Sequence, residues 1–571
     1  MTYRPVVNEQ RFLMQHVVRI DELAAHEAFS AASPDVVDAI LEGAGAFAAG
    51  EFAPLNRIGD TVGACWTADG VRMPDGFHAA YRAYVEGGWG SLAAAPEHGG
   101  QGLPFSLATA VLEDLGTANM GFSLVMMLTP GAVEALTTHG SAEQQATWLP
   151  RLVTGEWNGT MNLTEPQAGS DVGALRTMAT PAGDGSWRIK GTKIFITFGD
   201  HDLTDNIVHL VLARTPDAPA GTRGISLFLV PKFRLDGTPN DVRCVSIEHK
   251  MGIHASPTCV LSYGDNDDCH GWLIGPEHGG MRAMFTMMNN ARLNVGLQGV
   301  SIAERATQAA VAYASDRIQS ARAGAPSRTP VAIIEHPDVR RMLLRMKALT
   351  MAARALIYYA AGQADRGHLG DKAASARLDL LTPLAKAYGT DVGCEVSSLG
   401  VQVHGGMGFI EETGAAQHYR DARIAPIYEG TNGIQAADLV GRKLGLEGGA
   451  VLASLLADIR SEAAEEGALM ALADAVEVVS ARLAGADVDD QLAGSYPLLT
   501  MLSVAVAGWL LTRQSRAAAT AQGIDPAFLA LKQAAARFYL DRVVPEAIGL
   551  AEGATAGAAG LYTIDTAIFA A

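Results

Sequence analysis

The chain has 571 residues, of which 49% are hydrophobic and 18% are charged. Because this length exceeds what one hydrophobic core usually organises, three or four closely packed structural units are expected. The formal net charge is −18 and no run rich in lysine and arginine occurs, which disfavours binding to nucleic acid.

The cysteines indicate a reducing compartment. Five are present, an odd number without a C-x-x-C spacing, so free thiols are expected rather than a disulfide framework. No metal site is expected, because the spacings of Cys259, Cys269, His270 and His278 match no zinc pattern. The first residues lack a basic region followed by an apolar one, so the predicted localisation is cytoplasmic.

Residues 1–155 are predicted to form an N-terminal helical domain. From about Ser33 to Arg151 the apolar residues recur at helical spacing, interrupted by glycine-rich turns at residues 86–90 and 97–102. Neither turn has the G-x-G-x-x-G form that follows a strand in Rossmann folds, so a cofactor site of that type is not supported.

Residues 156–278 are predicted to form a central β domain. Short runs of β-branched and aromatic residues are separated by turn signals, as in an antiparallel sheet or barrel. The runs are residues 187–190, 193–197, 207–212 and 224–230.

The helical period returns in residues 279–447, which are predicted to form a helical bundle, and in a C-terminal helical extension, residues 448–571. Helices are expected at 282–322, 337–365, 374–403 and 433–444, then at 452–483, 497–522 and 526–551. Pro337 suits the first turn of the second helix. The uncharged stretch 491–512 approaches membrane-spanning length, but Pro497 favours a buried helix that starts near it, so no membrane insertion is expected. The fold class is mainly α with a central β domain.

Glu429 is the candidate catalytic residue, because it lies between bulky apolar residues and a turn of glycines. A carboxylate that leaves water has a raised pKa and can remove a proton from carbon. The alternative is that Glu429 caps a helix that begins near Thr431, since acids favour helix N-termini.

The loop 161–171 opens the β domain with threonine, proline, glycine and serine residues. Its backbone donors and hydroxyls are suited to holding a polar ligand. The same residue types are also favoured in an ordinary hydrogen-bonded turn, so both interpretations stay open at this point.

Four motifs in order resemble those of the acyl-CoA dehydrogenase family over about residues 34–445. They are Thr164-Glu165-Pro166 with Gly169-Ser170-Asp171, then Phe195-Ile196-Thr197, then residues 402–409, and Tyr428-Glu429-Gly430-Thr431. The helical tail and Asn432-Gly433 resemble the longer subfamily, which includes enzymes for methylthio-substituted acyl groups. The resemblance implies an α domain, a β domain and a helical bundle.

The resemblance also implies FAD as the cofactor, bound non-covalently. Residues matched to cofactor-binding positions are Met161, Leu163, Thr164, Gly169, Ser170, Phe195, Ile196, Thr197, Arg317, Gln402, Gly405, Gly406 and Thr431. In the family the contact equivalent to Arg317 is made with the pyrophosphate of the neighbouring subunit's FAD. A homodimer or higher homo-oligomer is therefore implied.

The substrate implied by the resemblance is an acyl-CoA thioester, oxidised to the trans-2-enoyl-CoA with Glu429 as base. Ser170, Arg292, Gly430 and Gly433 match substrate-binding positions. For Arg292 the alternative is an ordinary arginine on a helix surface. Some members carry the base one residue before this arginine, and here that residue is Ala291, so no acid competes with Glu429.

Several positions depart from the family pattern, and these leave the acyl group open. Phe195 stands where tryptophan is common, Met161 where tyrosine is frequent, and Gly433 where a polar residue is often found. A fatty acyl group and a 3-(methylthio)propanoyl group both remain candidates. The implied electron acceptor is an electron-transferring flavoprotein. The alternatives are an acyl-CoA oxidase that reduces oxygen and a non-catalytic flavoprotein of the same fold.

Overall fold

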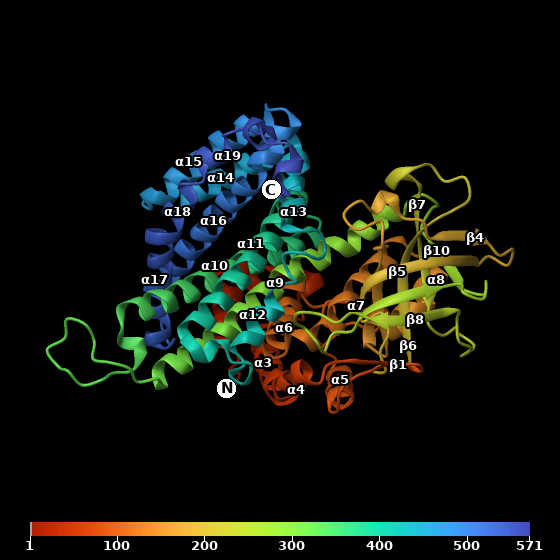
Figure 1. Cartoon of the computed structure of the whole chain (residues 1–571), viewed down its shortest axis with the longest axis horizontal. Coiled ribbons are helices and arrows are strands. Elements are labelled where there is room, and N and C mark those ends of the chain that lie inside the picture. The colour runs from red at the N-terminus through yellow and green to blue at the C-terminus, as the bar shows by residue number, and fades with distance from the viewer. Residues whose placement is uncertain (1–2, 571) are drawn as a thin grey trace. The chain divides into compact units, whose positions relative to one another are not determined.

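A computed structural model describes residues 3–570, which form two compact units (Figure 1). The first unit contains residues 3–7 and 27–294, and the second contains residues 8–26 and 295–570. The first combines helices with the β-sheet, whereas the second is helical. A mainly α protein with a central β domain is therefore confirmed as the fold class.

The first unit begins with helices around an apolar core, as the sequence predicts. A small hairpin, β1 (Cys65–Thr67) and β2 (Gly70–Arg72), was not expected. The helices are α3 (Pro34–Phe47), α4 (Asn56–Thr61), α5 (Phe77–Glu86), α6 (Phe105–Ala118), α7 (Met120–His139) and α8 (Ala142–Thr154). Ser141 starts α8 with a capping box, in which its side chain and that of Gln144 each bond the other's backbone N–H.

The sheet has eight strands in a nearly closed arrangement. They are β3 (Trp157–Asn162), β4 (Met178–Pro181), β5 (Trp187–Thr197), β6 (Asn206–Arg214), β7 (Ile225–Pro231), β8 (Val242–Ile247), β9 (Thr258–Tyr263) and β10 (His270–Ile274). The order is β10-β7-β6-β4-β5-β9-β8, and β10 also pairs with β5. The prediction of an antiparallel sheet or barrel holds for most pairs, but β6 pairs in parallel with both β3 and β4.

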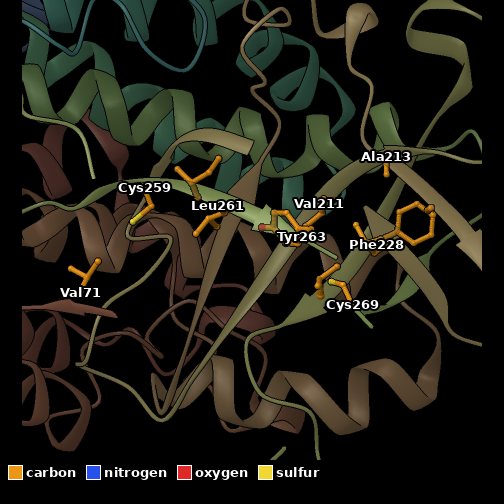
Figure 2. Packing of buried hydrophobic residues seen from close by; sticks show 12 residues of the cluster. Val71, Val211, Ala213, Phe228, Cys259, Leu261, Tyr263 and Cys269 are labelled. Atoms are coloured by element: carbon orange, nitrogen blue, oxygen red, sulfur yellow. The ribbon is translucent and has the colours of Figure 1, made fainter. Parts of the chain in front are cut away.

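Side chains from several strands form the core of the sheet (Figure 2). Val211 and Phe228 lie on the paired strands β6 and β7, whereas Leu261 and Tyr263 come from β9. All four are at most 1% exposed. Cys259 and Cys269 belong to the same apolar cluster, so their thiols pack as small apolar groups.

The runs 187–190 and 193–197 form one strand, β5, rather than two. Gly191 was interpreted as a turn, but it lies inside the strand and pairs with Tyr263 of β9. A Cβ atom on Gly191 would lie 2.8 Å from the Cβ of Thr177. Glycine is therefore required here for close approach of the neighbouring backbone, not for a turn.

The second unit consists of long helices and several short ones. N-terminal helices α1 (Val7–Leu13) and α2 (Ile20–Ala24) were not predicted. The others are α9 (Gly280–Asp316), which joins this unit from residue 295 onward, α10 (Pro337–His368), α11 (Lys372–His404), α12 (Ala415–Ala422), α13 (Asn432–Asp438), α14 (Ala450–Glu462), α15 (Gly467–Ala484), α16 (Val488–Thr520), α17 (Pro526–Phe538), α18 (Val544–Ile548) and α19 (Ala551–Ala554).

The helix boundaries partly match the sequence analysis. Helix α10 begins at Pro337 as predicted, but α9 ends at Asp316 and α12 was missed. The tail forms α14 to α19 rather than three helices. Helix α16 begins at Val488, so Pro497 lies inside it instead of starting it.

Helices α7 and α16 are each long and apolar enough to cross a membrane by length and composition. However, 78% of the apolar window in α7 and 83% of that in α16 are buried inside the protein. Core helices of globular proteins pass the same test, and the burial of α7 and α16 is typical of core helices.

The C-terminal extension packs directly on the helical bundle (Figure 1), with α16 against α10, α11 and α13. Trp509 of α16 is 1% exposed and meets Tyr359 of α10 edge to face, with ring centroids 5.3 Å apart. Arg345 of α10 forms a salt bridge of 2.9 Å with Glu546 of α18. The extension therefore covers bundle helices that would otherwise expose apolar surface.

Candidate active site

In the first unit, backbone bonds bring two of the four motifs together. Met161 lies in β3, and Leu163 and Thr164 follow directly after it. The backbone N–H of Ile194 in β5 donates to the carbonyl oxygen of Thr164 at 2.9 Å. The loop after β3 is thereby held beside the Phe195-Ile196-Thr197 segment, although more than 30 residues separate them along the chain.

A bulge in β5 presents Phe195. The pairing of β5 with β9 shifts between Lys193 and Ile196. Phe195 has a φ of 59° and remains 57% exposed, whereas Ile196 is 2% exposed. A left-handed conformation costs a bulky residue about 1–3 kcal/mol and is found most often at functional sites. Such an exposed aromatic ring suits a planar ligand with polar edges, because the partly exposed Thr197 follows two residues later and the Ile194 bond holds the partly exposed Thr164 beside the segment.

The same loop is fixed from inside by a buried ion pair. Lys193 is fully buried and its Nζ donates to Glu165 at 2.8 Å and to the carbonyl oxygen of Leu163 at 3.0 Å. Glu165 also accepts from the backbone N–H groups of Arg176 and Thr177. Burial alone would raise the pKa of Glu165, but the charge of Lys193 and these donors hold it below its ordinary value. Sequence analysis did not assign a role to either partner.

Other predicted residues of the first unit differ in exposure. Gly169 and Ser170 are exposed on the loop that follows Glu165. Arg292 is only 5% exposed, so the alternative of an ordinary surface arginine is wrong. Ala291 beside it is 2% exposed and has no acidic group to offer.

In the second unit, Glu429 occupies a strained turn. Its φ is 55° and that of Gly430 is 83°, so two successive residues adopt the left-handed region. Thr431 is the N-cap of α13, and its Oγ1 accepts from the backbone N–H of Ile434 at 3.2 Å. The alternative that Glu429 caps this helix is therefore wrong. Its side chain is partly buried, less than the sequence suggested.

Two buried amides that sequence analysis missed hold this turn. The side-chain nitrogen of Gln435 donates to the carbonyl oxygens of Glu429 and Gly430, at 3.4 and 3.2 Å. Asn432 is 3% exposed and is hydrogen-bonded to α11. Both lie on the buried face of α13, three residues apart. The sequence contained one signal for them: two polar residues three positions apart share a helix face with the apolar Ala436.

Arg317, Gln402, Gly405 and Gly406 form a second cluster in this unit. Arg317 follows the end of α9 and lines a cleft of about 280 Å³ with Ala312, Tyr313 and Asp316. Tyr313 stacks on His404, with centroids 4.5 Å apart, next to the Gly405-Gly406 segment. An exposed guanidinium beside such a cleft suits an anionic group such as a pyrophosphate.

Gly433 leaves open space in the first turn of α13. A Cβ atom there would meet only the Thr431 Oγ1 atom, at 3.7 Å, which is an ordinary contact. The residue is exposed and its backbone is not in the left-handed region. Larger side chains can therefore be accommodated without strain.

Family models match almost the whole of this chain. The N-terminal, middle and C-terminal domains of acyl-CoA dehydrogenase match residues 36–156, 160–265 and 278–444. A further model, acetyl-CoA dehydrogenase C-terminal like, matches residues 453–565. The chain belongs to the acyl-CoA dehydrogenase family. It is an oxidoreductase that acts on acyl-CoA, and its cofactor is FAD, which the donor groups and the cleft described above fit.

Relatives match this acyl-CoA dehydrogenase along most of its length. The 3-methylmercaptopropionyl-CoA dehydrogenase of Ruegeria pomeroyi is 47% identical and covers 96% of this chain and 97% of its own. A butyryl-CoA dehydrogenase of Syntrophomonas wolfei is 37% identical and covers 87% and 88%. The resemblance to the first enzyme includes the C-terminal extension.

Solved structures agree with the fold. A chain from the study of the electron transferring flavoprotein of Acidaminococcus fermentans is 28% identical, with a TM-score of 0.61 over 71% of this chain and 97% of that chain. The acyl-CoA dehydrogenase of Bacillus anthracis complexed with FAD is 23% identical, with a TM-score of 0.75 over 92% of this chain and 88% of that chain.

Among residues 3–570 no group of three or more His, Cys, Asp or Glu side chains is placed to hold a metal ion.

Replacing Lys193 by methionine should destabilise the first unit and weaken FAD binding. It leaves the buried Glu165 without its cation, which typically costs about 3–5 kcal/mol. Thermal unfolding and FAD titration of the apoprotein measure the two effects. Lys190→Met is the matched control, since Lys190 lies on the same strand in an exposed pair with Asp267. Equal stability of the Lys193→Met and Lys190→Met proteins would contradict this role of the buried pair.

Proposed function

We propose that this enzyme oxidises the Cα–Cβ bond of an acyl-CoA thioester, with Glu429 as the base that removes the α-proton. The observation that carries the proposal is the geometry of Glu429. Its backbone is held in the left-handed region by buried amides while its carboxylate remains partly exposed. FAD supplies the acceptor for the hydride that leaves the β-carbon. The product is then a trans-2-enoyl-CoA.

We assign the flavin contacts to Met161, Leu163, Thr164, Gly169, Ser170, Phe195, Ile196, Thr197 and Thr431. The bulge at Phe195 and the bond from Ile194 to Thr164 support this assignment, because they fix the residues that would orient a flavin ring. Gln402, Gly405, Gly406 and Arg317 would bind the nucleotide part. Since the family makes the Arg317 contact to a neighbouring subunit's FAD, we infer a homodimer or higher homo-oligomer.

The acyl group is proposed to be short, either 3-(methylthio)propanoyl or a short fatty acyl chain. The support is the similarity to the 3-methylmercaptopropionyl-CoA and butyryl-CoA dehydrogenases. Ser170, Arg292, Gly430 and Gly433 are the residues proposed to contact the substrate. The burial of Arg292 suits a cation that contacts a nucleotide phosphate away from water.

We propose an electron-transferring flavoprotein as the electron acceptor and the cytoplasm as the location. The similarity to a chain from such a flavoprotein system supports the first, and the free state of all five cysteines supports a reducing compartment. Anaerobic bleaching of the flavin by an acyl-CoA, followed by admission of air, tests the acceptor. We expect peroxide to form far more slowly than turnover with the flavoprotein. Peroxide formation at the turnover rate would instead identify an oxidase.

Glu429→Gln should retain FAD but lose bleaching of the flavin by acyl-CoA. A positioned base contributes about 10²–10⁴ in rate, so the rate of bleaching should fall by at least the lower figure. Stopped-flow absorbance measures it. The control is Glu447→Gln, because Glu447 is exposed and also has a left-handed backbone, with a φ of 49°. Undiminished bleaching in the Glu429→Gln protein would place the base elsewhere.

Gly433→Leu should shift the preference towards shorter acyl groups. The side chain would fill space beside the base-bearing turn, and each methylene excluded from such a pocket changes rates by about 10-fold or more. A series of acyl-CoA thioesters, including methylthio-substituted ones, followed by bleaching measures the shift. Gly441→Leu is the control, since a Cβ at Gly441 meets no atom within 4 Å and can likewise be accommodated without strain. An unchanged preference in the Gly433→Leu protein would remove this residue from the pocket.

A further inference from the structure

A chain of polar contacts, buried at Asn432 and exposed at Tyr496, connects the C-terminal extension with the turn that carries Glu429. It begins at Asn432, the first residue of α13, three positions after Glu429. The Nδ2 of Asn432 donates to Asp391 Oδ1 at 2.8 Å, and its Oδ1 accepts from Lys386 Nζ, also at 2.8 Å. Lys386 is fully buried. Asn432 is thereby fixed on α11 by a carboxylate and an ammonium group.

Asp391 links this amide to the extension. Its second carboxylate oxygen, Oδ2, accepts from the hydroxyl of Tyr496 at 2.8 Å. Tyr496 belongs to α16, so one carboxylate bridges α13 and the extension with its two oxygens. Hydrogen bonds to a charged group are about twice as strong as those between neutral groups. Tyr496 therefore restrains the orientation of the carboxylate that restrains Asn432.

Gln435 holds the turn through the carbonyl oxygens of Glu429 and Gly430, and the backbone of Asn432 adds a further contact. The backbone N–H of Asn432 donates to the carbonyl oxygen of Pro426 at 2.9 Å, which closes the loop that contains Glu429. A rotation of Asn432 would therefore move the base directly. Such a small displacement matters, because reaction rates depend steeply on the placement of the base relative to the α-carbon.

We propose that Tyr496 of the C-terminal extension is a positioning residue for Glu429, acting through Asp391 and Asn432. This inference rests on the proposed role of Glu429 as the base. It assigns the extension a part in the reaction besides covering the bundle. The contact that the hydroxyl of Tyr496 makes is with the Asp391 carboxylate, so its proposed effect on Glu429 is indirect.

Burial raises the pKa of Asp391, and hydrogen bonds from Tyr496 and Asn432 oppose that rise. Lys386 and Arg423 also favour the carboxylate form. Loss of the Tyr496 hydroxyl removes the hydrogen bond to Oδ2 of Asp391 and leaves the bond from Asn432 to Oδ1. The hydrogen-bond geometry and the neighbouring charges therefore both favour an ionised Asp391 that accepts from Tyr496 and from Asn432.

The test compares Tyr496→Phe with Tyr539→Phe in the full-length, FAD-loaded enzyme. Tyr539 offers a matched control, because its hydroxyl also joins the extension to α11, at 2.5 Å from that of Tyr388. Neither tyrosine of that pair contacts Asn432. Both variants keep the aromatic ring, but Tyr539→Phe leaves the buried Tyr388 hydroxyl without this partner, so melting temperature and FAD content are measured for each variant.

Two rates report on the base. One is flavin bleaching by a saturating acyl-CoA. The other is exchange of the α-proton with deuterated solvent in a 3-thia-acyl-CoA, in which sulfur replaces the β-carbon so that no hydride can leave. In the second reaction the proton removed from carbon is replaced by a solvent deuteron, with no oxidation or reduction.

For Tyr496→Phe we expect both rates to fall by about three- to thirtyfold, with KM within about twofold of wild type. Tyr539→Phe should keep wild-type rates. Wild-type exchange in Tyr496→Phe, or an equal loss in both variants, would overturn the inference while leaving the proposed function intact. A wild-type enzyme that no acyl-CoA bleaches would overturn the proposed function and the inference together.

Discussion

The turn at Glu429 depends on hydrogen bonds from amides buried beneath it. A left-handed backbone costs a residue with a side chain about 1–3 kcal/mol. Each hydrogen bond returns about 1 kcal/mol, and those to charged groups about 1.5–3 kcal/mol. Gln435 makes two bonds to the turn, and Asn432 is fixed by Lys386 and Asp391. Together these bonds are sufficient to hold the strained conformation at Glu429.

A similar arrangement occurs in the first unit. Phe195 also has a left-handed backbone, and the polar group beneath it is the buried pair of Lys193 and Glu165. In both places buried polar or charged groups lie beside strained backbone, at an exposed side chain for Phe195 and a partly exposed one for Glu429. Ion pairs of this kind add little net stability, but they fix one geometry because a buried charge without its partner is costly.

The sequence predicted the fold class and singled out Phe195 and Glu429 as candidate site residues, because periodicity and ordered motifs are local properties of the chain. It did not predict which residues support them. The sequence does not show whether Gly191 forms a turn or allows the close approach of Thr177. Pro497 was predicted to start a helix, because proline favours the first turn. It lies inside α16, which packs against the bundle helices, and the local sequence does not show that packing. The contact between Tyr496 and Asp391 joins residues 105 positions apart, and no local pattern encodes it.

The bridge at Asp391 also constrains how this enzyme can change over evolution. Loss of the extension would take away Tyr496 and leave one oxygen of a largely enclosed carboxylate without that donor. A shortened descendant would therefore be expected to need compensating substitutions at residue 391 and at Asn432 before the Glu429 turn regained a defined shape. This dependence favours keeping the longer chain once it has formed.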